Sequence, residues 1–268
     1  EAWLALVLIQ SSGRRYSEAI ATIESGLNAL PGESRLHTQY LELLGQTRQL
    51  TKLEEVVRHL PGLRMTLDRC LRMSEMYLET GNLSAAQRWL YKAREEAPYS
   101  ASGRLVFNEA RVLHDNGRLT GRLSWFIRAR DKYQRLLERD PDHVEGFHRY
   151  GWLLLRRFDA AQEAGSLAVR LLETVSPENL PAEVLDTLAE SLRQSSHTQR
   201  ALQIVTSGLE RFPESGALRF QHAALLLELS GGDQEREEQA FAALQQVQGF
   251  GVPAHHQKEF SELIPHAQ

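Results

Sequence analysis

The 268-residue sequence has one cysteine, 9 prolines and 18 glycines, and only four of its 31 basic residues are lysines. A lone cysteine, Cys70, excludes an internal disulfide and a CxxC metal site. The apolar run at residues 3–9 is too short to cross a bilayer and has no basic segment before it, so we predict neither membrane insertion nor a signal peptide in this segment. The sequence also lacks the GxxxxGK[ST], HExxH and GxSxG motifs. These absences predict a chain that is not an enzyme and has no cofactor.

Charge is nearly balanced, with 31 basic and 35 acidic residues and a net charge of -4. No overall field would draw such a chain to nucleic acid or to an anionic membrane, so nucleic acid is not the expected partner. Leu, Ala, Glu, Gln and Arg dominate, and these residues favour helices, which predicts an all-α fold. The chain enters an apolar helical pattern directly at Glu1, so we expect a piece of a longer polypeptide. The compartment stays open between cytoplasm and periplasm.

A repeat runs through the chain. Residues 19–31 recur as residues 201–213, and both segments have the pattern of an amphipathic helix that is stopped by proline. Prolines close such helices at positions 31, 61, 98, 141, 177 and 213, with a mean spacing of about 36 residues. This period predicts a solenoid of helical hairpins.

The residues at fixed positions resemble the tetratricopeptide repeat. In the third unit the matching positions are Met73, Ser74, Tyr77, Gly81, Ala86, Leu90, Ala93 and Pro98. The first and sixth units match at Trp3, Leu6, Ala19, Ile23, Gly26 and Pro31, and at Leu185, Leu188, Ala189, Leu192, Ala201, Val205, Gly208 and Pro213. The resemblance implies a right-handed superhelical solenoid of antiparallel hairpins, whose concave groove is lined mainly by the first helix of each hairpin.

We predict one repeat domain over residues 1–268, with about seven units and a C-terminal capping helix. The expected units are residues 1–31, 32–61, 64–98, 101–141, 142–177, 180–213 and 215–252, and the cap is 253–264.

Four units depart from the pattern. The second has Leu53 where a small residue is expected at the helix crossing. The fourth is about two turns too long, with its first helix ending at residues 116–117 and its second helix beginning early. In the fifth, Glu163 falls at the crossing unless the register slips by one residue to Ala164. The seventh has an acidic stretch, residues 233–238, between its helices.

The predicted partner-binding surface is the groove face of the fourth and fifth units. Its residues are donor-rich and aromatic, as in interface hot spots: Arg104, Phe107, Asn108, Arg111, His114, His148, Arg149, Trp152 and Arg156. Residues 104–157 have a net charge of +5, whereas the sixth unit is acidic at the same face, so the groove changes sign along its length. An acidic protein or peptide would suit the basic part. Two interpretations compete with a binding surface. Trp152 can pack within its own hairpin, and the excess of arginine can reflect only the composition of the whole chain.

Other reactive residues have simpler interpretations. Cys70 is expected to be a buried apolar residue. His255 and His256 are adjacent, so on a helix their side chains would diverge, and we expect solvated surface and no metal site. Trp125 and Phe126 lie in the extra turns of the fourth unit, where they can pack on a neighbouring hairpin or contact a partner.

The leading hypothesis is a non-enzymatic scaffold that binds another protein or peptide in the groove. Arginine-rich, lysine-poor usage is typical of bacterial proteins from GC-rich genomes. Bacterial tetratricopeptide-repeat arrays are often periplasmic arms of exopolysaccharide-export or envelope-assembly machines, so the resemblance implies such a role. One alternative is direct binding of a polymer, for which polysaccharide is favoured over RNA. The other is a regulatory repeat domain of a larger enzyme.

Overall fold

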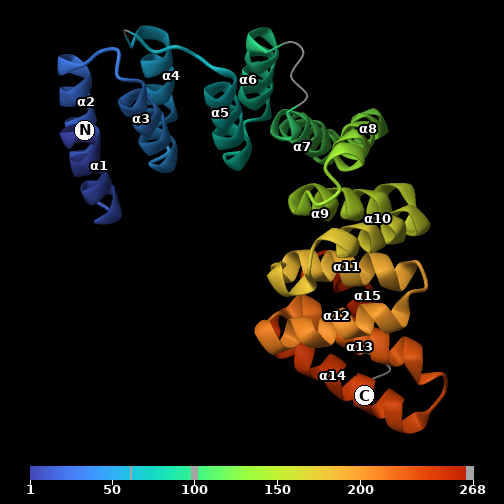
Figure 1. The fold of residues 1–268 in the computed structure, drawn as a ribbon. Helices are drawn as coiled ribbons and strands as arrows, with labels where there is room; N and C mark the ends of the chain where they lie inside the picture. The colour runs from blue at the N-terminus through green and yellow to red at the C-terminus, as the bar shows by residue number, and fades with distance from the viewer. Residues whose placement is uncertain (61, 98–101, 264–268) are drawn as a thin grey trace. The chain divides into compact units, whose positions relative to one another are not determined.

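The computed structural model describes residues 1–60, 62–97 and 102–263, which form helices joined by short turns (Figure 1). No strand occurs within these described ranges. The helices pair into seven hairpins and are followed by one short final helix. The predicted all-α solenoid of about seven units with a C-terminal helix is therefore confirmed.

Contacts divide the chain into two compact units, Glu1–Ala101 and Ser102–Gln268. The first unit contains three hairpins, formed by α1 (Ala2–Ser12) and α2 (Tyr16–Ala29), α3 (Ser34–Gln46) and α4 (Leu50–His59), and α5 (Leu67–Glu79) and α6 (Leu83–Glu96). Two of the prolines used for the repeat spacing, at positions 61 and 98, lie outside the described residues.

The second unit contains four hairpins and the final helix. The first two hairpins are α7 (Gly103–Thr120) with α8 (Leu123–Arg139), and α9 (Val144–Leu153) with α10 (Ala161–Thr174), where the π-helix η1 (Leu154–Phe158) follows α9 directly. After the short 3-10 helix η2 (Pro177–Asn179), the other two are α11 (Ala182–Gln194) with α12 (Thr198–Arg211), and α13 (Gly216–Ser230) with α14 (Gln234–Phe250). The final helix is α15 (Gln257–Leu263). Within the described part of the chain, no helix is both long and apolar enough to cross a membrane.

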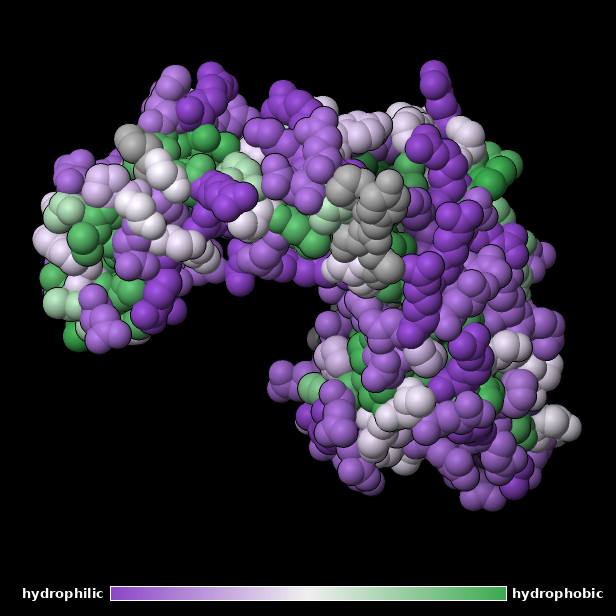
Figure 2. All heavy atoms as spheres, turned by 45° about the horizontal axis from the view of Figure 1, so that its top comes forward, coloured by the Kyte–Doolittle hydropathy of each residue, from purple (hydrophilic) through white to green (hydrophobic). Residues whose placement is uncertain are grey.

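Small residues allow the two helices of each hairpin to approach closely. The second helix of six hairpins has a fully buried alanine within its first two turns: Ala19, Ala86, Ala129, Ala164, Ala201 and Ala240. The second hairpin has Leu53 instead, also fully buried. A larger side chain at a closely packed crossing pushes the helices apart. Hydrophilic side chains cover most of the visible face, and hydrophobic ones show as smaller areas between them (Figure 2).

The extra turns of the fourth hairpin are shared between its helices. α7 continues past residues 116–117 to Thr120, so the expected helix end there is wrong, and α8 begins early, at Leu123, as expected. α7 can continue because Gly117 faces Phe126, whose ring would lie 2.7 Å from a Cβ atom at this position. Phe126 is 1% exposed, so it packs within its own hairpin, with Trp125 beside the same core.

The acidic stretch of the seventh unit is helical. α14 begins at Gln234, and the Asp233 carboxylate accepts hydrogen bonds from the backbone N–H groups of Glu235 and Arg236. The expectation that residues 233–238 separate the helices is therefore wrong. Acidic side chains stabilise a helix N-terminus through its partial positive charge, so these residues start the helix one turn early.

The fifth hairpin takes the slipped register. Ala164 is fully buried at the crossing, whereas Glu163 is half-buried, accepts a hydrogen bond from the Tyr150 hydroxyl at 2.5 Å and pairs with Arg130. The π-helix η1 lies between α9 and α10, and a π turn contains about one residue more than an α turn, which is consistent with the one-residue slip. Asp159 then ends η1 in a left-handed conformation with φ of 49°.

The final helix packs back onto the first helices of two hairpins. The Phe260 ring of α15 lies 6.2 Å from the Phe220 ring of α13, and Glu259 pairs with Arg193 of α11 at 2.9 Å. Figure 1 shows α15 beside α11 and α13.

Burial predicts where the fold opens first. In α4 only Leu53 is buried, whereas α11 buries all nine residues from Val184 to Leu192. Since protection from exchange follows buried contacts, we expect backbone amides of α4 to exchange at least about tenfold faster than those of α11 in native-state hydrogen exchange. The amides of α6, in the same unit as α4, provide the comparison, and equal protection in α4 and α6 would contradict this account.

Candidate functional site

A cavity of about 440 Å³ lies in the second unit, between the first helices of three consecutive hairpins. We call it the α7–α11 groove. Its lining residues are His114 and Arg118 of α7, His148, Arg149, Trp152 and Leu153 of α9, Arg156 and Arg157 of η1, Glu183 and Asp186 of α11, and His255. First helices line the concave face in repeat arrays of this kind, so the groove lies where a partner is expected.

Five of the nine predicted residues line this groove: His114, His148, Arg149, Trp152 and Arg156. The other four belong to the earlier turns of α7 and do not line it. Phe107 is 5% exposed and Asn108 is 1% exposed, so both side chains lie in the interior. Arg111 stacks over the Phe107 ring at 5.7 Å. Arg104 is half-buried. Because α7 is longer than expected, its last turns border the groove and its first turns pack inside the hairpin.

Sequence reasoning missed two of the arginines. Arg118 lies beyond the expected end of α7, and Arg157 follows Arg156 within the π-helix. The guanidinium of Arg156 lies 4.9 Å from the centre of the Trp152 ring, and that of Arg157 lies 4.7 Å from the centre of the Phe126 ring. The sequence signal for Arg157 was its position next to Arg156, but in an ordinary α-helix two consecutive side chains point about 100° apart. Here both side chains, on η1, line the same cavity.

The basic part of the groove has an excess of positive charge. Four arginines line it, against two carboxylates. Burial, together with the positive charges of Arg149, Arg118 and Arg157, lowers the pKa of His114 to about 4. Burial and the charge of Arg149 also lower the pKa of His148. The Nδ1 atom of His148 lies 2.6 Å from the Thr187 hydroxyl oxygen. The excess of arginines over carboxylates gives this part of the groove a local positive potential that suits an anionic group.

The acidic end of the groove holds the two C-terminal histidines. His255 Nε2 lies 2.8 Å from Asp186 Oδ2, and His256 Nε2 lies 2.7 Å from Asp186 Oδ1. His256 is fully buried, so the expected solvated pair is wrong for this residue. The expected divergence is also wrong, because the pair lies in the turn before α15 and not within a helix. Burial raises the pKa of Asp186, but hydrogen bonds from both imidazoles outweigh it and hold that pKa well below its usual range.

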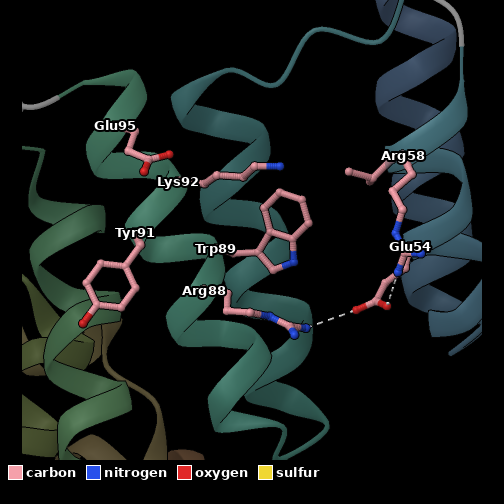
Figure 3. Close-up of a pocket in the computed structure, with 8 residues that line it drawn as sticks. Glu54, Arg58, Arg88, Trp89, Tyr91, Lys92 and Glu95 are labelled. Atoms are coloured by element: carbon pink, nitrogen blue, oxygen red, sulfur yellow. Dashed lines mark hydrogen bonds and ion pairs between the residues drawn. The ribbon is translucent and has the colours of Figure 1, made fainter.

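A second cavity, of about 410 Å³, lies in the first unit between α4 and α6. Figure 3 shows the Trp89 indole beside Lys92, with Arg88 turned toward Glu54, while Tyr91 points away from them. Arg88 and Arg58 both pair with the Glu54 carboxylate, at 3.4 and 3.5 Å. Since its arginines already share a carboxylate, this cavity has less positive charge to offer than the α7–α11 groove.

The groove offers groups that can bind an anionic partner. Arginine side chains form paired hydrogen bonds with carboxylates, and Trp152 offers an aromatic face beside them. Cys70 is fully buried in the first unit, as expected, and burial raises the pKa of its thiol to about 11. A thiol in that state is not a nucleophile at neutral pH.

No protein-family model matches the sequence, and no curated protein is similar to it in sequence. Among solved structures, the chain is similar to MamA from Desulfovibrio magneticus RS-1, at 13% identity and a TM-score of 0.52, over 69% of this chain and 94% of that one. It is similar to PilF from Pseudomonas aeruginosa, at 21% identity and a TM-score of 0.52, over 70% and 77%. It is also similar to YrrB, described as a TPR protein with an unusual peptide-binding site, at 15% identity and a TM-score of 0.53, over 74% and 90%. The chain thus has the fold of the tetratricopeptide-repeat proteins.

Proposed function

We propose that the chain is a non-enzymatic scaffold that binds an acidic segment of another protein in the α7–α11 groove. The observation that supports this most strongly is the lining of the groove, where Arg118, Arg149, Arg156 and Arg157 lie against two carboxylates, Glu183 and Asp186. A partner carboxylate placed there would supply the missing negative charge. Peptide binding by the structurally similar YrrB is consistent with this proposal.

The arginines are placed to orient such a segment. The Arg149 side chain is 27% exposed, and its ion pair with Glu145, at 3.4 Å, lies within one exposed helix turn, so a partner can compete for it. Arg156 rests on Trp152, and a partner side chain can contact the ring and the cation together. The segment would lie with its acidic residues toward α7 and away from Glu183 of α11.

We expect charge reversal in the groove to abolish most of the binding. A fluorescein-labelled hepta-glutamate peptide is the probe, and fluorescence anisotropy at low salt is the measurement. Arg149→Glu should weaken binding at least about tenfold, because it replaces an attractive charge with a repulsive one. Arg58→Glu, in the cavity of the first unit, is the matched control and should change the affinity less than about twofold. Equal weakening by both variants would show only attraction to net charge and would contradict the proposal.

Polymer binding is the competing function, and the salt dependence of binding separates the two. A protein that neutralises many phosphates or sulfates loses affinity steeply with salt, in proportion to the number of contacts. We expect a shallow dependence for the peptide and no tighter binding of RNA or of an anionic polysaccharide. Bacterial envelope assembly or exopolysaccharide export stays a prediction from composition, as does regulation of a fused enzyme.

A further inference from the structure

Three metal-ligating side chains converge at the acidic end of the groove. Among the described residues, Asp186, His255 and His256 each offer one ligand atom, and these atoms lie within 4.8 Å of one another. The two imidazole Nε2 atoms contact different oxygens of the same carboxylate, at 2.8 and 2.7 Å. Asp186 and His256 are almost fully buried, while the His255 side chain is 38% exposed.

The surrounding side chains have an excess of negative charge. Arg193 of α11 pairs with Glu190 at 2.9 Å, with Glu259 at 2.9 Å and with Glu228. Arg156 adds a second cation, 3.9 Å from Glu190. Of these carboxylates Glu190 is fully buried, and so almost is Asp186, whereas Glu228 and Glu259 are partly exposed. Buried carboxylates need nearby positive charge, because uncompensated charge is costly away from water.

Two sources could supply that charge: protons on both imidazoles, or one divalent cation. The imidazole rings of His255 and His256 lie only 4.3 Å apart between their centres. Two imidazolium ions so close would repel each other, and one of them would be fully buried. A divalent cation between neutral imidazoles gives the same charge without that repulsion.

Neighbouring side chains hold the three residues in place. Gln221 donates a hydrogen bond to Asp186 Oδ1 at 3.0 Å, which fixes the carboxylate. The Phe220 ring lies 4.6 Å from the His256 ring, and the Trp152 ring lies 4.5 Å from the His255 ring. Such neighbours orient ligands and exclude water. His255 also lines the α7–α11 groove, which gives an ion a route from solvent.

We propose that Asp186, His255 and His256 bind one divalent transition-metal ion, with Zn²⁺ the best match to the ligands. Two imidazoles and one carboxylate suit zinc and its neighbours better than Mg²⁺ or Ca²⁺, which prefer oxygen ligands. Each Nε2 atom then gives its lone pair to the metal, and its proton moves to Nδ1 or to solvent. Tetrahedral zinc holds its ligand atoms about 3.3 Å apart, so each Nε2 atom must move about half an ångström away from the carboxylate oxygen that it contacts. Water or a groove ligand would complete the coordination.

Titration of the metal-free protein tests this site without any partner, so its failure leaves the peptide proposal untouched. After dialysis against EDTA, Zn²⁺ is added in a calorimeter at pH 7.5, and Co²⁺ is added separately to record visible absorption. We expect one Zn²⁺ per chain and the intense absorption of four- or five-coordinate Co²⁺. Because ligands must lose their protons, binding should weaken from pH 7.5 to pH 6.

His255→Gln is the informative variant, because this half-exposed position tolerates substitution better than buried His256. We expect it to weaken Zn²⁺ binding at least about tenfold and to remove the Co²⁺ absorption. Asp186→Asn should do the same, with circular dichroism to check the fold. His59→Gln, on the exposed surface of α4, is the control and should bind as the wild type does. No zinc binding by the wild type, or equal affinity in wild type and His255→Gln, would overturn the proposal.

Discussion

Gly165→Val is expected to destabilise the second unit by about 3 kcal/mol, near the upper end of the usual cost of overpacking a closely packed site. A Cβ atom on Gly165 would lie 2.0 Å from Ser195 Oγ, 2.4 Å from Ser195 Cβ and 3.3 Å from the Ser191 carbonyl oxygen. The Ser195 Cβ atom is fixed to the backbone of the segment after α11, so no side-chain rotation relieves the clash. α10 and α11 would have to separate, which opens the core around Ala164 and Ala168.

Urea unfolding followed by circular dichroism measures this effect as a loss of free energy of unfolding. The control is Gly249→Ala in α14, where a Cβ atom would meet nothing within 4 Å. That variant should be neutral or slightly stabilising, since alanine favours helix over glycine. A loss below about 1 kcal/mol for Gly165→Val would show that α10 and α11 are not packed as described.

Acid is expected to destabilise the protein through His114. Its pKa is about 4 in the folded protein, against 6.5 for an ordinary histidine, because burial and Arg149 disfavour the charged imidazole. Above pH 6.5 the imidazole is neutral in both states and has no effect. As the pH falls from 6.5 to 4, the unfolded chain binds the proton and the folded protein does not. The shift therefore removes about 3 kcal/mol of stability across that window.

The difference between wild type and His114→Gln isolates this contribution from other acid-labile groups. Between pH 7 and pH 4.5, the wild type should lose about 2 to 3 kcal/mol more free energy of unfolding than the variant. His59→Gln replaces an exposed histidine and should lose stability with pH as the wild type does. Parallel pH profiles for wild type and His114→Gln would refute a buried, neutral His114.

The repeat could be predicted from the sequence because six of the seven hairpins have a small residue at the helix crossing, and the helix ends recur at nearly fixed spacing. Ala86 and Ala201 lie at the crossings where the pattern places them. The irregular hairpins needed contacts that are distant in sequence. Gly117 resembles a helix end until Phe126 is seen against it, and the acidic residues after Asp233 resemble a loop until their role as a helix start is seen.

The groove residues of α9 could be predicted from the sequence, whereas those of the neighbouring elements could be predicted only in part. His148, Arg149 and Trp152 follow the ordinary spacing of a groove face, so the repeat alignment found them. The π-helix that adds Arg157 has no clear sequence signal, because a π turn depends on the packing of the whole hairpin. The contact of His255 with Asp186 joins residues 69 positions apart and depends on how α15 folds back.

Nuclear magnetic resonance of the chain during titration with the hepta-glutamate peptide tests the groove most directly. We predict that the pKa of His114 rises as peptide is added, because the peptide's carboxylates offset the charges of Arg149, Arg118 and Arg157. The indole signal of Trp152 should shift at the same peptide concentrations, and that of Trp89 in the first unit should not. Binding that shifts Trp89 and leaves the pKa of His114 unchanged would contradict an anionic partner site in the α7–α11 groove.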